Sequence, residues 1–411
     1  MTILHASPNR GRPADGLDRA LPPVTRFRLS ALHAAAFVQF GIALPFLPVW
    51  LASRGLAPST IGLVLAGPIV TRILVTAPLM TLVDGRVGPR LLLAASHAAM
   101  ALAYGVLLLA EGALAIGIVI ALAAVAQAVV VPGNDVVTLD AVRRRPDLSY
   151  SRLRVWGSIS FLAASLAAGI LVQRFGPGVV GPLLAVVPLL GLAATLGAVP
   201  HRLGGEARPG GERAATEATR RDAGLPRALW FAIAAAACIQ ATHASLYTFG
   251  SLHWRSLGFP DALIGALWAV GVVAEILLFS ALGAVTTARA AFALLGLGAV
   301  AALIRFPGLA LDPGLAPTFV LQALHGLTFG AMHLGSMAIL SLLAPEGARG
   351  RAQGLLAAAL ALVTAAATLA CGPLYTALGR GLFLAMVPLA LIGLAFVALA
   401  WRAQQKGHNT G

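Results

Sequence analysis

The sequence predicts an all-α membrane protein with twelve transmembrane helices in two pseudo-symmetric six-helix bundles. Three observations lead to this fold class: the composition, the recurrence of long apolar runs, and an internal repeat. Of the 411 residues, 59% are hydrophobic and only 11% are charged, and the mean hydropathy is +0.88. Because soluble domains are about a quarter charged, this composition indicates an integral membrane protein.

Twelve apolar runs are long enough to cross about 30 Å of hydrocarbon as helices. The chain lacks the short alternating segments that are typical of outer-membrane barrels. The predicted spans are residues 30–52, 59–82, 90–110, 113–137, 153–174, 178–199, 227–251, 261–284, 288–306, 315–343, 352–374 and 380–402.

A Gly-, Arg- and Glu-rich stretch without apolar periodicity divides the spans into two groups of six and is predicted to be a flexible linker. We therefore expect a cytoplasmic tail over 1–29, a bundle over 30–200, the linker over 201–226, a second bundle over 227–403, and a tail over 404–411.

The two halves resemble each other. Residues 55–62 and 258–265 match at an offset of 203, and each lies between the first and second spans of its half. At the same offset, Arg72 and Glu275 occupy equivalent positions in the two halves. Parallel six-span repeats are typical of rocking transporters, whose binding site lies near the midplane between the halves.

The positive charge is distributed as membrane topology requires. Of the 29 Lys and Arg residues, 23 lie in the two tails and in the connections on their side of the membrane. Two, Arg72 and Arg305, lie inside spans, and four lie in the opposite connections. This asymmetry predicts a multi-pass protein of a bacterial-type inner (plasma) membrane with both termini in the cytoplasm. It also accounts for the net charge of +14 without nucleic acid as a partner.

Glu275 lies near the middle of an apolar span. A charged side chain there costs roughly 2.5–3.5 kcal/mol on insertion scales, so it requires an explanation. A structural ion pair or a solvated helix end would explain it, and so would a protonatable group on a transport path. We predict a proton-coupling group made of Glu275, Arg305 as its ion-pair partner, and His325; whether Glu275 carries the proton or holds an arginine in place stays open.

Polar and aromatic side chains recur at helical spacing in the spans that surround Glu275. Each of these side chains, taken alone, could equally serve only to pack one helix against another. Together they predict a substrate site lined by Gln39, Arg72, His243, Tyr247, Trp268, Gln322, Phe329 and His333. No metal site is expected, because His325 and His333 are eight residues apart and the two cysteines have no metal-binding spacing.

The polar connections on the cytoplasmic side supply candidate gating residues. They are Asp84, Arg86, Arg90, Asp140, Arg152 and Arg154. The position of Asp140 allows two interpretations, a solvated helix end or an acid in a cavity.

No hydrolytic or nucleotide-binding motif occurs, so we expect neither an enzyme nor a bound cofactor. An ion gradient is then the expected source of energy. The expected partners are a small-molecule substrate, protons and membrane lipid, and the protein is expected to act as a monomer.

The chain resembles permeases of the major facilitator superfamily and, more closely, the phenylpropionate permease family. The segments that carry the resemblance are Tyr150–Ser158, Gly271–Glu275 and Leu324–Phe329 with His333. The superfamily's loop signature after the second span fits Asp84, Arg86, Gly88 and Arg90 only with one inserted residue. An acid on span eight, an arginine on span nine and a histidine on span ten also resemble, more distantly, the lactose permease, a proton symporter.

This resemblance implies proton-coupled uptake of a small organic solute by alternating access. It suggests an aromatic acid as the substrate, although related permeases handle nucleosides and sugars. Two alternatives stay open: an efflux antiporter on the same fold, and a membrane sensor or assembly factor that transports nothing.

Overall fold

The computed structural model describes residues 25–84, 87–145, 147–199, 224–283 and 285–408. Within these ranges every regular element is helical, and twelve helical segments are long and apolar enough to cross a membrane. The predicted fold class is therefore confirmed.

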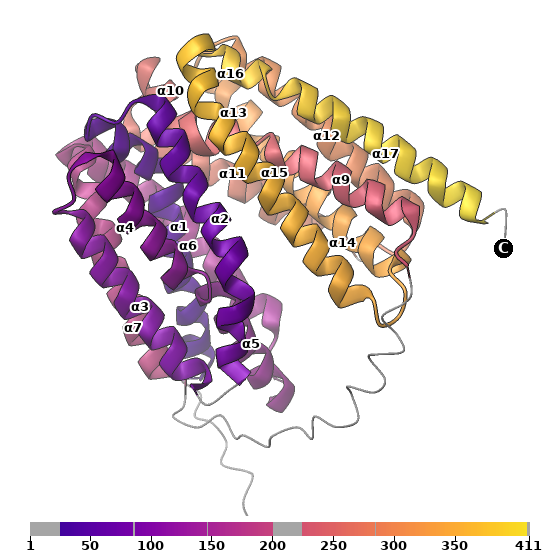
Figure 1. Ribbon diagram of the computed structural model, residues 1–411, viewed down its shortest axis with the longest axis horizontal. Coiled ribbons are helices and arrows are strands. Elements are labelled where there is room, and N and C mark those ends of the chain that lie inside the picture. The colour runs from indigo at the N-terminus through magenta and orange to yellow at the C-terminus, as the bar shows by residue number, and fades with distance from the viewer. Residues whose placement is uncertain (1–24, 85–86, 146, 200–223, 284, 409–411) are drawn as a thin grey trace, which may run out of the picture.

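The helices form two bundles that lie side by side (Figure 1). The first bundle contains α1 (Thr25–Ser53), α2 (Pro58–Asp84), α3 (Gly88–Leu107), α4 (Gly112–Gln127), α5 (Val130–Arg144), α6 (Tyr150–Phe175), η1 (Pro177–Val179) and α7 (Val180–Ala198). The second contains α9 (Arg227–Ala241), η2 (Leu246–Gly250), α10 (Ser251–Ser256), α11 (Asp261–Ala281), α12 (Ala288–Ala310), α13 (Leu315–Ala323), η3 (Gly326–Ala331), α14 (Met332–Leu343), α15 (Arg349–Leu378), α16 (Gly381–Leu384) and α17 (Val387–His408).

The helix ends differ from the predicted spans at both ends of the chain. α1 begins at Thr25 and α17 continues to His408, so parts of both predicted tails are helical. Polar residues can extend a transmembrane helix beyond the hydrocarbon, and hydropathy does not detect that extension. Most of the predicted linker and of the N-terminal tail lies outside the described residues.

Two spans of the second bundle contain short π-helical turns, η2 and η3. π-helical turns occur as local bulges and are frequent at functional sites. Both turns contribute residues to the cavities between the bundles, which are described below.

One buried core joins the two bundles at one end of the molecule. It includes Phe46 and Trp50 from α1, near the end of that helix, together with Trp254, Leu267 and Phe383 from the second bundle. At the opposite end, where α1 begins, each bundle has its own separate core. The bundles are therefore packed together at the end where α1 finishes and apart at the end where it starts, as Figure 1 shows.

Glycines allow the two close crossings at the packed end. A Cβ on Gly372 of α15 would meet the backbone oxygen of Pro58 and Cα of Ser59 on α2, both at 2.7 Å. A Cβ on Gly169 of α6 would meet the backbone oxygen of Asp261 on α11 at 2.5 Å. Glycine is thus required at both crossings, because any side chain would overlap with the backbone of the opposite bundle.

Candidate functional site

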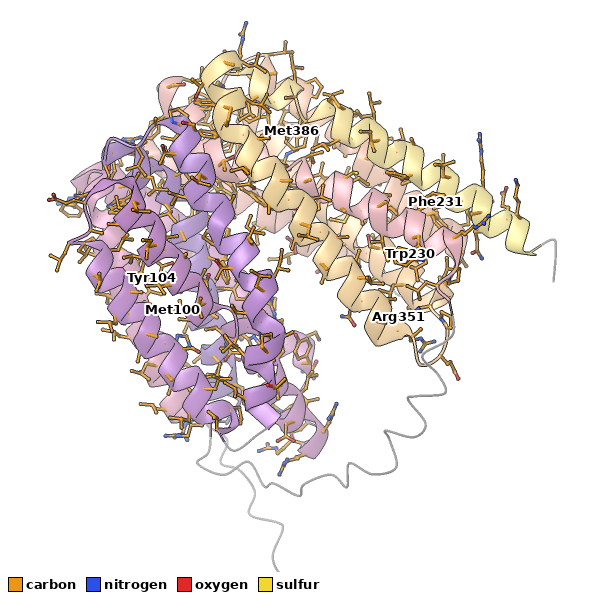
Figure 2. The ribbon with its side chains drawn as sticks, in the orientation of Figure 1. Met100, Tyr104, Trp230, Phe231, Arg351 and Met386 are labelled. Atoms are coloured by element: carbon orange, nitrogen blue, oxygen red, sulfur yellow. The ribbon has the colours of Figure 1, made fainter. Side chains whose placement is uncertain are left out.

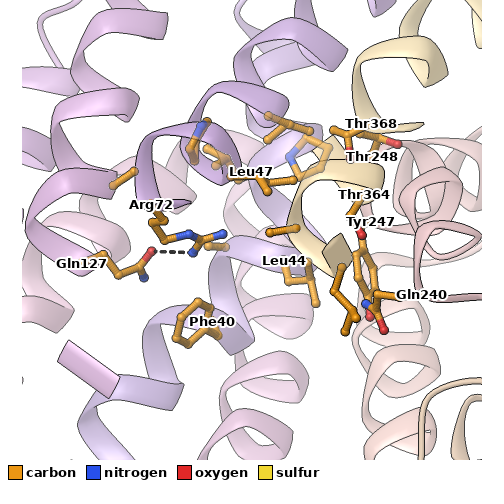
Figure 3. A pocket seen from close by; sticks show the side chains of 18 of the residues that line it. Phe40, Leu44, Leu47, Arg72, Gln127, Gln240, Tyr247, Thr248, Thr364 and Thr368 are labelled. Carbon is orange, nitrogen blue, oxygen red and sulfur yellow. Dashed lines mark hydrogen bonds between the residues drawn. The ribbon is translucent and has the colours of Figure 1, made fainter. Parts of the chain in front are cut away.

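A cavity of about 560 Å³ lies between the two bundles (Figure 3). Its wall is mostly apolar and includes Phe40, Leu44, Tyr247 and Phe329. Among the described residues that line it, Arg72 alone belongs to the charged types Asp, Glu, Lys and Arg. Binding sites for small molecules commonly combine an apolar wall with few polar groups, so this cavity suits a small apolar molecule that carries one anionic group.

Arg72 projects from α2 toward Gln127 of α4. Its Nη1 donates a hydrogen bond to Oε1 of Gln127 at 3.3 Å. Figure 3 shows this pair on one wall of the cavity, with Gln240 and Tyr247 on the wall of the second bundle. A guanidinium has five N–H donors, and one long hydrogen bond leaves others available to a ligand carboxylate.

A second cavity of about 240 Å³ adjoins the first, because Leu44, Tyr247 and Phe329 line both. It contains more charged side chains than the first cavity. Its polar lining includes Arg154 of α6, Glu275 of α11, and Arg305, Gln322 and His325 of the second bundle, with Trp268 beside them.

Arg305 is buried, with 1% of its surface exposed, and its guanidinium forms hydrogen bonds with uncharged side chains. Its Nη2 donates to Oε1 of Gln322 at 2.7 Å. Its Nη1 donates to Oγ1 of Thr328 at 2.9 Å and reaches Nδ1 of His325 at 3.3 Å. The predicted ion pair between Arg305 and Glu275 is not formed among the described residues, since these three neutral side chains occupy the guanidinium instead.

The hydrogen bonds of His243 define its neutral tautomer. Nδ1 lies 3.0 Å from the backbone oxygen of Gln240, which can only accept, so Nδ1 carries the proton. Nε2 then accepts from the hydroxyl of Thr328 at 3.0 Å, and the same hydroxyl oxygen accepts from Arg305. His243 therefore supports Arg305 through Thr328.

Glu275 of α11 and Arg154 of α6 lie in the same cavity and come from different bundles. Both side chains line the second cavity, and Arg154 is the cation whose charge acts on Glu275. Arg154 also lies over the ring of Phe37, 4.1 Å from its centroid. Arg154, predicted as a gating residue, thus has its guanidinium in the candidate site.

Aromatic rings connect the two cavities. His325, Phe329 and His333 form a continuous stack, with centroid separations of 5.3 and 5.9 Å and nearly parallel planes. Tyr247 and Trp268 lie 5.9 Å apart at the junction. These side chains give a flat aromatic wall against which an apolar ring can pack.

Two predicted substrate contacts, Gln39 and His243, line neither of these two cavities. Gln39 is next to Phe40 on α1, and because successive side chains of a helix point in different directions, only Phe40 faces the large cavity. His243 is fully buried beneath Tyr247 and lines neither cavity.

Comparison with known sequences assigns the chain to a family. The sequence model described as "MFS_1 like family" matches residues 27–385. The chain is 31% identical over 363 residues to the "Probable 3-phenylpropionic acid transporter" of Escherichia coli (strain K12), with 86% of this chain and 92% of that protein covered. The chain belongs to the MFS_1 like family. It is a multi-pass membrane protein and a transporter of the major facilitator superfamily (MFS).

Solved structures of MFS transporters share the fold at low sequence identity. The nucleoside transporter NupG, as its D323A mutant, has a TM-score of 0.74 at 16% identity and covers 91% of this chain and 99% of its own. A bacterial homolog of the human lysosomal transporter Spinster, solved in an inward-facing and unoccupied conformation, has a TM-score of 0.70 at 14% identity, with 93% and 97% covered.

Three of the remaining predicted gating residues, Arg90, Asp140 and Arg152, line neither cavity. Arg144 pairs with Asp140 one turn earlier at 3.0 Å, so Asp140 is a paired acid at a helix end. Arg90 donates to the backbone oxygen of Val199 and ties α3 to the end of α7. Arg152 lies on the exposed start of α6, and Arg86 and the Asp84 side chain lie outside the described residues.

The connection between α5 and α6 carries a further ion-pair cluster. Arg145 and Arg26 each donate to the carboxylate of Asp147 at 2.9 Å. Hydrogen bonds from Arg145 first and Arg26 second hold the pKa of Asp147 well below its usual range. The cluster joins the start of α1 to this connection.

Several residues of the cavity wall did not emerge from the sequence. Gln127 is an isolated amide within an apolar span, and the cost of a polar group in a membrane would have been a sufficient signal for it. Thr364 and Thr368 of α15 also line the large cavity, but single threonines are frequent in transmembrane helices and gave no signal.

Proposed function

We propose that this MFS transporter carries a small aromatic acid together with a proton into the cell by alternating access. The supporting observation is the pair of adjoining cavities between the bundles. One combines an aromatic wall with Arg72, and the other contains Glu275 and Arg154. The name of the Escherichia coli relative, a 3-phenylpropionic acid transporter, agrees with an anion that carries one ring.

In this proposal the substrate carboxylate pairs with the available donors of Arg72. The ring of the substrate packs against Phe40, Tyr247 and Phe329, which surround the apolar part of the cavity. Arg is suited to this task because its planar fork can hold both carboxylate oxygens at once. Arg305 remains within its own network of neutral acceptors, and its charge contributes to the field around the bound anion.

The proton is carried by Glu275. Its charged form is stabilised by Arg154 from the other bundle, so protonation of Glu275 weakens an attraction that crosses the transport path. The two bundles can then move relative to each other without separating opposite charges. This links the protonation state of one carboxylate to the rocking of the bundles.

The open end of the structure is assigned to the cytoplasm, because the positive-inside rule puts both termini there. The protein resides in a bacterial-type inner membrane, and the described conformation faces inward. Substrate would be released at this end and loaded in the opposite conformation.

Transport in proteoliposomes tests the proposal. Wild-type protein is expected to accumulate labelled 3-phenylpropionate under a proton gradient that is acidic outside. Glu275→Gln is expected to lose accumulation and to retain exchange of internal for external substrate, since a neutral amide fixes the state that resembles protonated glutamate. Glu111→Gln is the matched control, because that carboxylate is exposed and lies outside both cavities.

Normal accumulation by Glu275→Gln would show that this residue does not carry the proton. Gradient-driven loss of substrate from loaded vesicles would instead identify an efflux antiporter. Absence of any movement of 3-phenylpropionate by wild-type protein would reject the proposed substrate.

A further inference from the structure

A third, much smaller cavity lies inside the first bundle, behind the wall that carries Arg72. Its volume is about 10 Å³, which is close to the space that one water molecule requires. Its polar lining consists of Gln39 of α1, His97 of α3 and Gln127 of α4. Apolar residues, among them Met100 and Val187, complete the wall.

Three polar atoms at this cavity have no hydrogen-bond partner among the described protein groups. They are Oε1 and Nε2 of Gln39 and Nδ1 of His97. The Gln39 amide also lies beside the hydroxyl of Tyr104. Gln39 is 2% exposed and His97 is 3% exposed, so bulk water does not reach them. Buried amide and imidazole groups are almost always hydrogen-bonded, and an ordered water is the usual partner when protein groups are too far away.

The packing around His97 holds its ring at this position. A Cβ on Gly191 of α7 would overlap with the ring of His97, so the absence of a side chain at that glycine makes room for it. Figure 2 shows Met100 and Tyr104, which follow His97 on α3, within the first bundle. Met100 lines the small cavity, and Tyr104 lines the large one beside Arg72.

Gln127 connects the small cavity to the large one, because it lines both. Its Oε1 accepts the hydrogen bond from Arg72. The amide of Gln127 therefore touches the candidate ligand-binding arginine and also lines the small cavity with Gln39 and His97.

We propose that one buried water molecule occupies the small cavity, bridges Gln39, His97 and Gln127, and thereby fixes Arg72 in the orientation that receives the substrate carboxylate. The water donates one hydrogen bond to Oε1 of Gln39 and pairs with Nδ1 of His97, while Nε2 of Gln39 is directed at the hydroxyl of Tyr104. It accepts from the NH₂ group of Gln127, whose oxygen is then directed at Arg72. Gln39 and His97 are positioning residues, since they act on the substrate only through Gln127 and Arg72.

This inference rests on the proposed binding of an aromatic carboxylate by Arg72. Its consequence is specific to the carboxylate. Without the bridge, Gln127 and Arg72 gain rotational freedom, and recognition of a charged carboxylate weakens more than recognition of the uncharged part of the same molecule.

The test compares Gln39→Leu, His97→Leu and the conservative His97→Gln in proteoliposomes, with 3-phenylpropionate as the transported probe. For the two leucine variants we expect KM to rise about tenfold, the loss that accompanies a weakened hydrogen bond to a charged group, with kcat nearly unchanged. Competition by the uncharged 3-phenylpropionamide should stay at the wild-type level. His97→Gln retains polar atoms and should recover most of the affinity.

Thr195→Val is the matched control, since Thr195 on α7 is equally buried and its hydroxyl oxygen also has no partner among the described groups, but it does not line the cavity. A wild-type KM for Gln39→Leu would overturn the proposal. So would an equal loss of affinity for the carboxylate and the amide, because that result indicates a general packing defect.

A map of the wild-type protein in nanodiscs, at a resolution that reveals ordered water, provides a readout independent of transport. Density for one water between Gln39, His97 and Gln127 supports the bridge, and a direct hydrogen bond between Gln39 and His97 without such density overturns it. If wild-type protein does not bind 3-phenylpropionate, the proposed function fails, and this map still decides the occupancy of the cavity.

Discussion

The guanidinium of Arg305 is the most constrained charge in the site. It forms hydrogen bonds with Gln322, Thr328 and His325, and the Thr328 hydroxyl in turn donates to His243. Helical spacing in the sequence correctly grouped most of these side chains as neighbours. Spacing along one helix does not determine which group on another helix a charge will touch, so the predicted partner, Glu275, differs from the partners that the packing provides.

Thr328→Val should destabilise the protein, because it removes an acceptor from a buried cation and a donor to His243. We expect a loss of about 1–3 kcal/mol in the free energy of unfolding, the usual cost of leaving a buried polar group without its partner. Thermal denaturation in detergent measures this loss. Ser280→Ala, which removes an exposed hydroxyl bonded to its own helix, is the control and should leave the midpoint unchanged. Equal midpoints for both variants would contradict the assigned network.

Arg72→Lys should raise the KM for 3-phenylpropionate about tenfold, and Arg72→Gln should raise it further. Lysine keeps the charge but lacks the planar fork that binds two carboxylate oxygens, whereas glutamine also removes the charge. Initial rates of uptake measure both effects, and Arg289→Lys, outside the cavities, is the control. Wild-type affinity in Arg72→Gln would show that another group binds the carboxylate, and Arg154 and Arg305 of the second cavity are then the candidate cations.

At the scale of helices, hydropathy located all twelve spans but not the interruptions within them. The span from Leu315 to Leu343 is divided into α13, η3 and α14, and the span from Gly112 to Arg144 is divided into α4 and α5. Hydropathy measures the transfer of side chains, and it is insensitive to the hydrogen-bond register of the backbone. The π-helical turn η3 carries Thr328 and Phe329, so a structural detail invisible to composition forms part of the candidate site.

The close contact between α2 and α15 is predicted to keep the packed end of the molecule closed. Gly372→Val would force α15 away from α2, because its Cβ meets backbone atoms that cannot rotate aside. Overpacking of this kind costs about 1–3 kcal/mol, which shifts a conformational equilibrium roughly 5- to 150-fold toward states in which this end is open.

Reactivity of a single cysteine at Leu44 measures this shift. In a background without Cys238 and Cys371, Leu44→Cys should react faster with a membrane-impermeant maleimide from the packed end when Gly372→Val is present. Gly67→Val is the matched control on α2, since a Cβ there meets nothing within 4 Å. Equal labelling rates in both variants would show that this crossing does not close the packed end.

At the scale of the whole molecule, the internal repeat relates the two glycine crossings that hold the bundles together at the packed end. The offset of 203 that relates Arg72 to Glu275 also relates Gly169 to Gly372, and it relates Asp261 to Pro58. The two crossings are therefore the same contact made twice, once in each direction across the interface. The repeat alone could indicate equivalent positions, but only the folded chain shows that these glycines meet the opposite bundle.

Because one core joins the bundles at the packed end and separate cores hold them at the other, the cavity should be reached from the side on which α1 begins. Ala357 of α15 is exposed and lines the large cavity. Ala357→Cys, in the background without other cysteines, should react with an impermeant thiol reagent in inside-out vesicles and much less in right-side-out vesicles. Bound 3-phenylpropionate should slow the reaction, since it occupies the same cavity. Faster labelling in right-side-out vesicles would reverse the assigned orientation, and labelling from both sides at equal rates would require both conformations to be populated without substrate.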